Sequence, residues 1–230
     1  MKTIVKVLLI ALIVSVLGQC KKDTNLYVTI PDDNFLNALI VRGVDKNGDG
    51  IISTGEAAEI TFLNIFGRNI SDLKGIEAFV NLDSLNCVYN QLTRMDITKN
   101  HKLIFLLCGE NSLTSLDVSN NPALYTLACY GNSLTSIDVS NNPELISLFC
   151  NSNSLTSLDV SNNTALINLV CGDNQLTSLD LSNNTLLEEF NLASMPSLNK
   201  VCVWTMPFPP AGVTVDSTSS PNVYFTMECN

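Results

Sequence analysis

The 230-residue chain repeats with a period of 21. Cysteine recurs at positions 87, 108, 129, 150 and 171, and asparagine follows three residues later in each copy. Each period divides into two shorter units of the form Leu-x-x-Leu-x-Leu-x-x-Asn, with Cys or Val as the third apolar residue in some copies. Alternate residues of a short strand point the same way, so the apolar positions face inward. Because one coil cannot bury its apolar side alone, the pattern predicts stacked coils that form a solenoid with two short parallel sheets.

These units resemble leucine-rich repeats of the nested 10- and 11-residue variety, and the resemblance covers residues 60–203. The first coil is similar to internalin-type repeats, most closely in the ISDLKGI segment at residues 70–76. The IPDDNF segment at residues 30–35 opens an expected helix over residues 31–44, and it is similar to the internalin amino-terminal cap. The resemblance therefore implies a mostly β leucine-rich repeat solenoid behind a small α-helical, EF-hand-like N-terminal cap.

The repeat boundaries divide the chain into five expected segments. These are a signal peptide (1–19), an N-terminal tether (20–28), a helical cap with a calcium loop (29–59), the solenoid (60–203) and a C-terminal cap (204–230).

The first twenty residues have the features of an export signal. Lys2 and Lys6 precede an apolar run that is too short to span a bilayer, which needs about 20 residues. The segment that ends at Cys20 resembles a lipoprotein signal of the Bacteroidetes type, which implies that Cys20 is acylated and becomes the first mature residue. Cleavage between Gly18 and Gln19 is the alternative. We therefore expect an outer-membrane lipoprotein, on the cell surface or in the periplasm, or else a secreted protein.

Residues 45–56 match the twelve-residue EF-hand loop at every ligand position. Calcium is a hard cation that takes six to eight oxygen ligands. The expected ligands are Asp45, Asn47, Asp49, the Ile51 carbonyl, Ser53 through a water, and Glu56 with both oxygens. The alternative is a solvated acidic turn. The sequence contains no second loop to form a pair, so we expect a structural Ca²⁺ that fixes the cap on the first coil rather than a sensor.

The eight cysteines fall into three groups. The five periodic ones occupy inward positions, where small apolar side chains fill a narrow core, and we expect them to be structural rather than metal-binding or redox-active. Cys202 and Cys229 lie outside the regular ladder. In an exported protein they can form a disulfide that closes the C-terminal cap. Cys20 is the expected lipid anchor.

The two sides of each coil differ in variability. One side reads Leu-Thr-Ser-Leu-Asp-Val-Ser almost unchanged, which places a column of aspartates at positions 96, 117, 138, 159 and 180. The other side varies from coil to coil and carries large apolar residues at outward positions. An exposed apolar patch usually marks an interaction site. The candidate partner-binding residues are Tyr89, Phe105, Leu107, Tyr130, Phe149 and Val170. Alternatively, the tail or a side chain of the cap covers this patch.

Charge and composition narrow the function. With 12 Lys and Arg against 22 Asp and Glu, the net charge of −10 argues against nucleic-acid binding. His101 is the single histidine, which argues against a catalytic triad and against a His-rich metal site. We therefore expect a non-enzymatic module that binds a protein or glycan, with membrane contact only through the lipid on Cys20. The alternative is a structural or adhesive spacer with no specific ligand.

Overall fold

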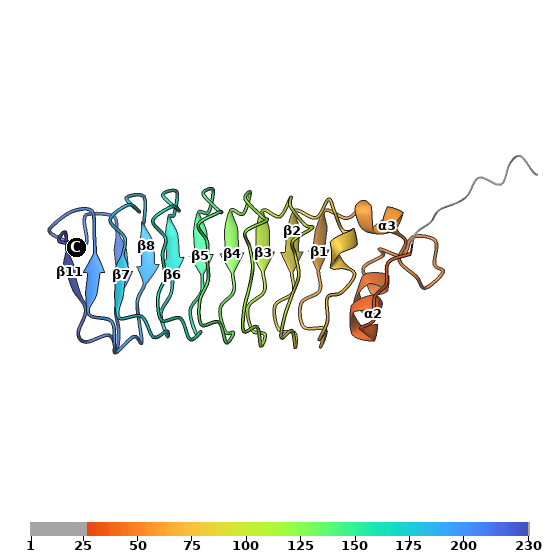
Figure 1. The fold of residues 1–230 in the computed structure, drawn as a ribbon, viewed down its shortest axis with the longest axis horizontal. Coiled ribbons are helices and arrows are strands. Elements are labelled where there is room, and N and C mark those ends of the chain that lie inside the picture. Colours follow the sequence, from red (N-terminus) through yellow and green to blue (C-terminus); the bar gives the residue numbers. More distant parts are fainter. Residues whose placement is uncertain (1–26, 230) are drawn as a thin grey trace, which may run out of the picture.

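The computed structural model describes residues 27–229, which form a rod of stacked coils with a helical cap at one end (Figure 1). The cap holds helices α2 (Asp33–Val41) and α3 (Thr54–Ala58), and the first coil contains the 3₁₀-helix η1 (Ile76–Ala78). The strands are β1 (Phe62–Asn64), β2 (Ser84–Asn86), β3 (Phe105–Leu107), β4 (Thr126–Ala128), β5 (Ser147–Phe149), β6 (Asn168–Val170), β7 (Ser178–Asp180), β8 (Glu189–Asn191), β9 (Lys200–Cys202), β10 (Thr214–Asp216) and β11 (Tyr224–Thr226). The predicted mostly β solenoid is confirmed.

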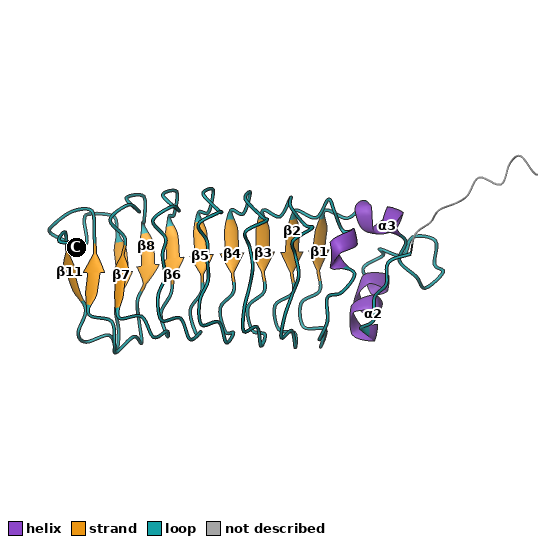
Figure 2. Ribbon diagram, in the orientation of Figure 1, coloured by secondary structure: helices purple, strands orange, loops and turns teal. Residues whose placement is uncertain are grey.

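One side of the rod is a long parallel sheet in the order β1-β2-β3-β4-β5-β6-β8-β10 (Figure 2). The register advances by one repeat at each step, so that Leu85, Leu106, Leu127 and Leu148 stand in line. The middle residue of each of these strands is buried except in β10, where Val215 is half-buried. The inward and outward alternation expected for a short strand therefore holds along the sheet.

The opposite side forms a sheet only near the C-terminus, in the order β11-β9-β7. The corresponding segments of the earlier coils are not strands, although their aspartates accept the same backbone hydrogen bond as Asp180 of β7, where Ser182 N–H donates to Asp180 Oδ1 at 2.9 Å. Ser119 N–H donates to Asp117 Oδ1, and Ser140 N–H donates to Asp138 Oδ1, each at 2.9 Å. This local turn is found whether or not the segment before it is a strand, so it does not decide where the sheet ends. The second sheet is shorter than the repeat pattern alone suggests.

Two columns of asparagine, the first half-buried in its middle coils and the second fully buried, hold neighbouring coils together. In the first, from Asn90 to Asn174, the side chain bonds twice to the preceding coil: Asn132 Nδ2 donates to Cys108 O at 3.1 Å, and its Oδ1 accepts from Leu113 N at 2.9 Å. In the second column, which runs from Asn100 to Asn184 in steps of 21 residues, each Nδ2 donates to two backbone carbonyls of the preceding coil. The Oδ1 atoms of this second column are buried and have no hydrogen-bond partner within residues 27–229.

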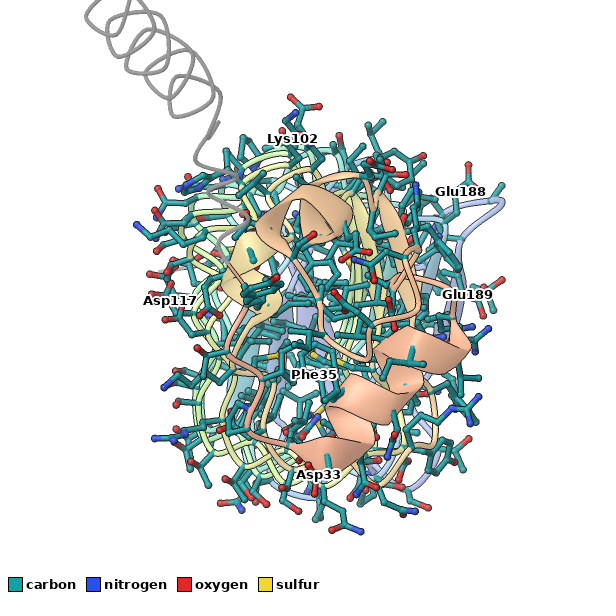
Figure 3. All side chains as sticks on the ribbon, turned by 90° about the vertical axis from the view of Figure 1, so that its right-hand side faces the viewer. Asp33, Phe35, Lys102, Asp117, Glu188 and Glu189 are labelled. Carbon is teal, nitrogen blue, oxygen red and sulfur yellow. The ribbon has the colours of Figure 1, made fainter. Side chains whose placement is uncertain are left out.

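The cap closes the solenoid by placing Phe35 of α2, which is fully buried, over the interior (Figure 3). Helix α2 begins at Asp33 behind the N-cap Asp32 and ends at Val41, three residues before the expected end, because Gly43 adopts a φ of +75°. Gly75 admits the cap closely: a Cβ there would lie 2.7 Å from Ile30 Cγ1. The cap and the first coil are therefore packed as one unit.

The C-terminal cap covers the last coils with strands β10 and β11 and a group of aromatic rings. Phe208 lies 5.8 Å from Phe190, 5.4 Å from Trp204 and 4.9 Å from Phe225, measured between ring centroids. β10 pairs with β8, and β11 pairs with β9, so the tail packs on the end of the rod. Within residues 27–229, no helix is long and apolar enough to cross a membrane.

Candidate calcium loop and partner-binding face

The predicted calcium loop follows α2 and ends in the first turn of α3, and hydrogen bonds from its backbone to its own side chains shape it. Asp45 accepts hydrogen bonds from Gly48 N at 2.8 Å and Gly50 N at 2.9 Å. Asp49 Oδ1 accepts from Ile51 N at 2.9 Å, and Asn47 Oδ1 accepts from Asp49 N at 2.8 Å. Such bonds shape the loop while leaving other oxygen lone pairs on these side chains.

Glu56 reaches back across the loop from the first turn of α3. Its Oε2 accepts from Ser53 N at 2.9 Å and Ser53 Oγ at 2.8 Å, and its Oε1 accepts from Lys46 N at 2.9 Å. These hydrogen bonds, above all those from Ser53, lower the pKa of the Glu56 carboxyl to about 2. A carboxylate is therefore fixed in its ionised form at the twelfth loop position. The donor set consists only of oxygen atoms, three of its members are carboxylates, and it fits a hard divalent cation such as Ca²⁺.

The rear of the loop pairs with the N-terminal segment of the described chain. Val28 N donates to Ile52 O at 2.8 Å, Tyr27 and Ser53 form an antiparallel bridge, and Ile52 is fully buried. The position that usually faces a second EF-hand is thus used to attach the loop to the solenoid.

The outward side of the long sheet, which we call the sheet face, carries exposed aromatic rings near its N-terminal end. The exposed fractions lie between 42% and 64% for Phe62, Phe66, Tyr89, Phe105 and Tyr125. Two ring contacts link them: Phe66 meets Tyr89 edge-on, with ring centroids 5.3 Å apart, and Phe105 and Tyr125 are tilted against each other, 6.0 Å apart. The described tail packs at the other end of the rod, so neither it nor the described cap covers these rings.

The candidate partner-binding residues do come together on this face. Leu107, Phe149 and Val170 are half-buried and lie in one column across β3, β5 and β6, with the buried Ala128 between Leu107 and Phe149. Sequence reasoning missed Phe62, Phe66 and Tyr125. The first two lie in the atypical 22-residue first coil, and Tyr125 lies just before its strand. The first two would have been found by extending the list of outward positions to the first coil, and Tyr125 by including the residue before each strand.

Tyr130 lies flat against the preceding coil because that coil has glycine beneath it. A Cβ at Gly109 would lie 2.7 Å from the Tyr130 ring. Desolvation raises the pKa of Tyr130, and the nearby Tyr89 and Glu110 raise it further. Tyr89, Glu110 and Tyr130 thus form a cluster across three successive coils.

The five ladder thiols are all fully buried, from Cys87 to Cys171. Burial raises the pKa of Cys87, Cys129 and Cys171 to about 12, so their nucleophilic thiolate form is suppressed. Their placement agrees with a structural column.

Cys202 and Cys229 lie close together at the C-terminal cap. Their sulfurs and one carboxylate oxygen of Asp180 all lie within 4.8 Å of one another. Both cysteines are free thiols in this structure, and burial together with the Cys229 thiol raises the pKa of Cys202 to about 11. The disulfide between them stays a prediction.

Comparisons with known proteins agree on the fold. No family model matches the chain. Internalin J of Listeria monocytogenes serotype 4b is 37% identical over 70 residues, which span 30% of this chain and 8% of that protein. Internalin C2 of L. monocytogenes has a TM-score of 0.66 at 20% identity, covering 85% of this chain and 94% of the other. The internalin InlF of the same species has a TM-score of 0.63 at 21% identity, covering 86% and 71%. The chain thus has an internalin-like leucine-rich repeat solenoid fold.

Proposed function

We propose that this internalin-like leucine-rich repeat protein is exported, carries a lipid on Cys20, binds a structural Ca²⁺ in its cap and captures a protein partner on its sheet face without catalysis. The observation that carries the binding role is the row of exposed aromatic rings on the sheet face. Aromatic side chains supply large contact areas and dominate the energetics of protein interfaces. A scaffold alone does not require rings that face solvent on one end of one sheet.

The binding role is tested with the mature chain immobilised and exposed to outer-surface protein extracts and to glycan arrays. We expect the Phe105→Ala, Phe149→Ala double variant to lose at least about tenfold in affinity for the captured ligand, as loss of interface anchors does. The matched control is Thr114→Ala, Thr156→Ala on the opposite side, where both threonines are exposed. Unchanged affinity in the Phe variant, with both variants folded, would exclude the sheet face. A ligand found only on the glycan array would replace the protein partner with a saccharide.

Calcium binding is proposed from the loop residues and their fit to an oxygen-coordinated cation. Because the ion binds only the folded cap, free Ca²⁺ at about 100 times Kd stabilises the fold by about 3 kcal/mol. For a chain of this size we expect a chelator to lower the Tm by about 8 °C. The Asp49→Ala variant should melt near the chelated wild type and respond to neither chelator nor Ca²⁺. Asp33→Ala, which changes the same charge outside the loop, should keep the response. A wild-type melt unaffected by chelator, with a silent calorimetric titration, would contradict the proposal.

A structural role for the ion is favoured over a sensing role. The loop lies directly before the first coil, and Ile52 is part of the hydrophobic core that continues into the solenoid. Val28, which donates to Ile52 O, lies close to Gly75 of the first coil. Calcium is therefore expected to change the stability of the cap rather than the shape of the sheet face.

Export and lipid anchoring rest on residues 1–20, which lie outside the described residues. The proposal follows from the positive start, the short apolar run and the cysteine at its end. Incorporation of labelled palmitate that is lost in Cys20→Ala supports the lipoprotein. A mature chain that begins at Gln19 would instead indicate a secreted protein.

A structural spacer remains the second candidate, and the repetitive aspartate column favours it. Asp96, Asp117, Asp138 and Asp159 lie on an exposed side with few sequence differences between coils. Such a surface keeps a rod soluble and needs no ligand. Ligand capture that survives changes on the sheet face but requires the aspartates would support this role.

A further inference from the structure

The sheet face carries charge of one sign. We consider the part of this face formed by strands β2–β6 and β8, together with the residue before each strand and the three residues after it. These positions include the acidic residues Asp83, Glu110, Asp173, Glu188 and Glu189 and contain no lysine or arginine. Figure 3 shows Glu188 and Glu189 on the side of the rod opposite Asp117. The excess of acidic over basic residues therefore holds for this face by itself as well as for the whole chain.

Aromatic rings and a carboxylate meet in the N-terminal half of this face, on the coils of β2, β3 and β4. Tyr89, on the coil of β2, is 55% exposed and keeps its ring against Phe66. Tyr130, two coils further on, lies over Gly109. Glu110 occupies the coil between them, and its carboxylate lies beside Gly131, where a Cβ would come within 2.8 Å of Oε1.

Nothing in the described part of the chain neutralises this carboxylate. Within residues 27–229 the Glu110 side chain takes part in no hydrogen bond or ion pair, and Lys46–Glu59 is the ion pair found there. The aspartates on the opposite side differ, because Asp117 and Asp138 each accept a hydrogen bond from a backbone N–H two residues on. Those aspartates are also not flanked by aromatic rings. The sheet face thus combines an unpaired anion with tyrosine rings, and the opposite side does not.

We propose that the partner of the sheet face presents a basic segment, with a lysine or arginine seated against Tyr89 and Tyr130 and paired with Glu110. This inference rests on the proposed binding function and specifies its partner. A cation near the face of a tyrosine is attracted by the ring, and a nearby carboxylate adds charge complementarity. Further cationic residues along the segment meet Asp173, Glu188 and Glu189 on the coils of β6 and β8. A protein with an acidic or uncharged contact surface would leave five like charges unpaired.

The test uses the full mature chain and fluorescein-labelled octa-arginine as the probe, with octa-glutamine as the uncharged control. Binding is followed by fluorescence anisotropy at low and moderate salt. We expect saturable binding of octa-arginine that weakens about fivefold in Glu110→Gln and in Tyr89→Ala, the range for a semi-exposed ion pair or cation–π contact. The matched control Asp117→Asn removes the same charge from the opposite side and should change Kd less than about twofold. Tyr89→Phe, which keeps the ring, should bind as the wild type does.

Equal loss of affinity in Glu110→Gln and Asp117→Asn would mean diffuse attraction to an acidic rod and would overturn the inference, as would the absence of saturable binding. The proposed function fails separately. If the Phe105→Ala, Phe149→Ala variant loses a captured partner while Glu110→Gln keeps it at all salt concentrations, the face binds but the partner is not basic. If every variant keeps the partner, the sheet face is not the binding surface. Circular dichroism melts of each variant confirm that the fold is intact.

Discussion

Replacing Asn142 with aspartate is expected to cost about 4 kcal/mol of unfolding free energy, the range for a buried charge without a partner. Asn142 is fully buried, and its Nδ2 donates to Val118 O at 3.1 Å and to Asn121 O at 2.8 Å. Aspartate places an oxygen where both carbonyls require a donor, and its charge has no cation nearby. Urea denaturation followed by circular dichroism measures the loss, which corresponds to a fall in Tm of about 12 °C for a chain of this size.

The preceding residue supplies the control. Asn141 is exposed, and Asn141→Asp adds the same charge one position away. We expect its unfolding free energy to change by less than about 0.5 kcal/mol. If the two variants unfold alike, the asparagine column does not hold the coils together as its hydrogen bonds indicate.

Replacing Asp32 with alanine is expected to release the cap from the first coil at a cost of about 3 kcal/mol, because several charge-assisted hydrogen bonds are lost together. Asp32 Oδ1 accepts from Phe35 N at 2.9 Å and so caps α2. Its Oδ2 accepts from Ser71 N and Ser71 Oγ, both at 2.8 Å, and from Asp72 N at 3.0 Å. Hydrogen exchange of the α2 amides, together with urea denaturation, measures the effect.

Asp33→Ala is the matched control, since Asp33 is exposed in the first turn of α2 and contributes only through the helix dipole, at up to about 1 kcal/mol. If the two variants lose the same stability, the link from Asp32 to the first coil is not what holds the cap.

The contribution of Asp32 also depends on pH. Burial alone would raise the pKa of this carboxyl, but the hydrogen bonds from Ser71, Phe35 and Asp72 outweigh burial and lower it. The folded pKa is thus below the unfolded value of about 3.9, so the stabilisation is complete above about pH 4 and is lost as the pH falls through the folded pKa. The difference in stability between wild type and Asp32→Ala should therefore shrink in acid.

Features that repeat were predictable from the sequence. A side chain that recurs every 21 residues must occupy equivalent positions in stacked coils, so the burial of Cys108 and Leu113 followed from spacing alone. The candidate loop ligands could be named from the sequence for a different reason, since each step of a twelve-residue turn is local in sequence. The loop geometry in the structure is compatible with that prediction, and the melting experiment with a chelator tests whether the loop binds calcium.

Features that depend on distant or single residues were not predictable. Asp32 bonds to Ser71 across 39 positions, and no local pattern marks that pair. The second sheet was expected along the whole rod, but within residues 27–229 it contains only β7, β9 and β11. Phe62 and Phe66 belong to the first coil, which has 22 residues, so aligning the chain on its 21-residue period does not identify their positions.

The parallel register has a consequence for how such a rod can change in evolution. In the long sheet, each strand from β2 to β6 pairs with the strands of the two neighbouring coils, and equivalent positions of the repeat are paired at every junction. Duplication or deletion of one 21-residue unit in the gene would therefore rejoin compatible surfaces and leave both ends of the molecule unaltered. Each such event would move the far tip by about 4.8 Å relative to the start of the chain. The length of the rod can thus change by recombination without a change in the two ends of the molecule.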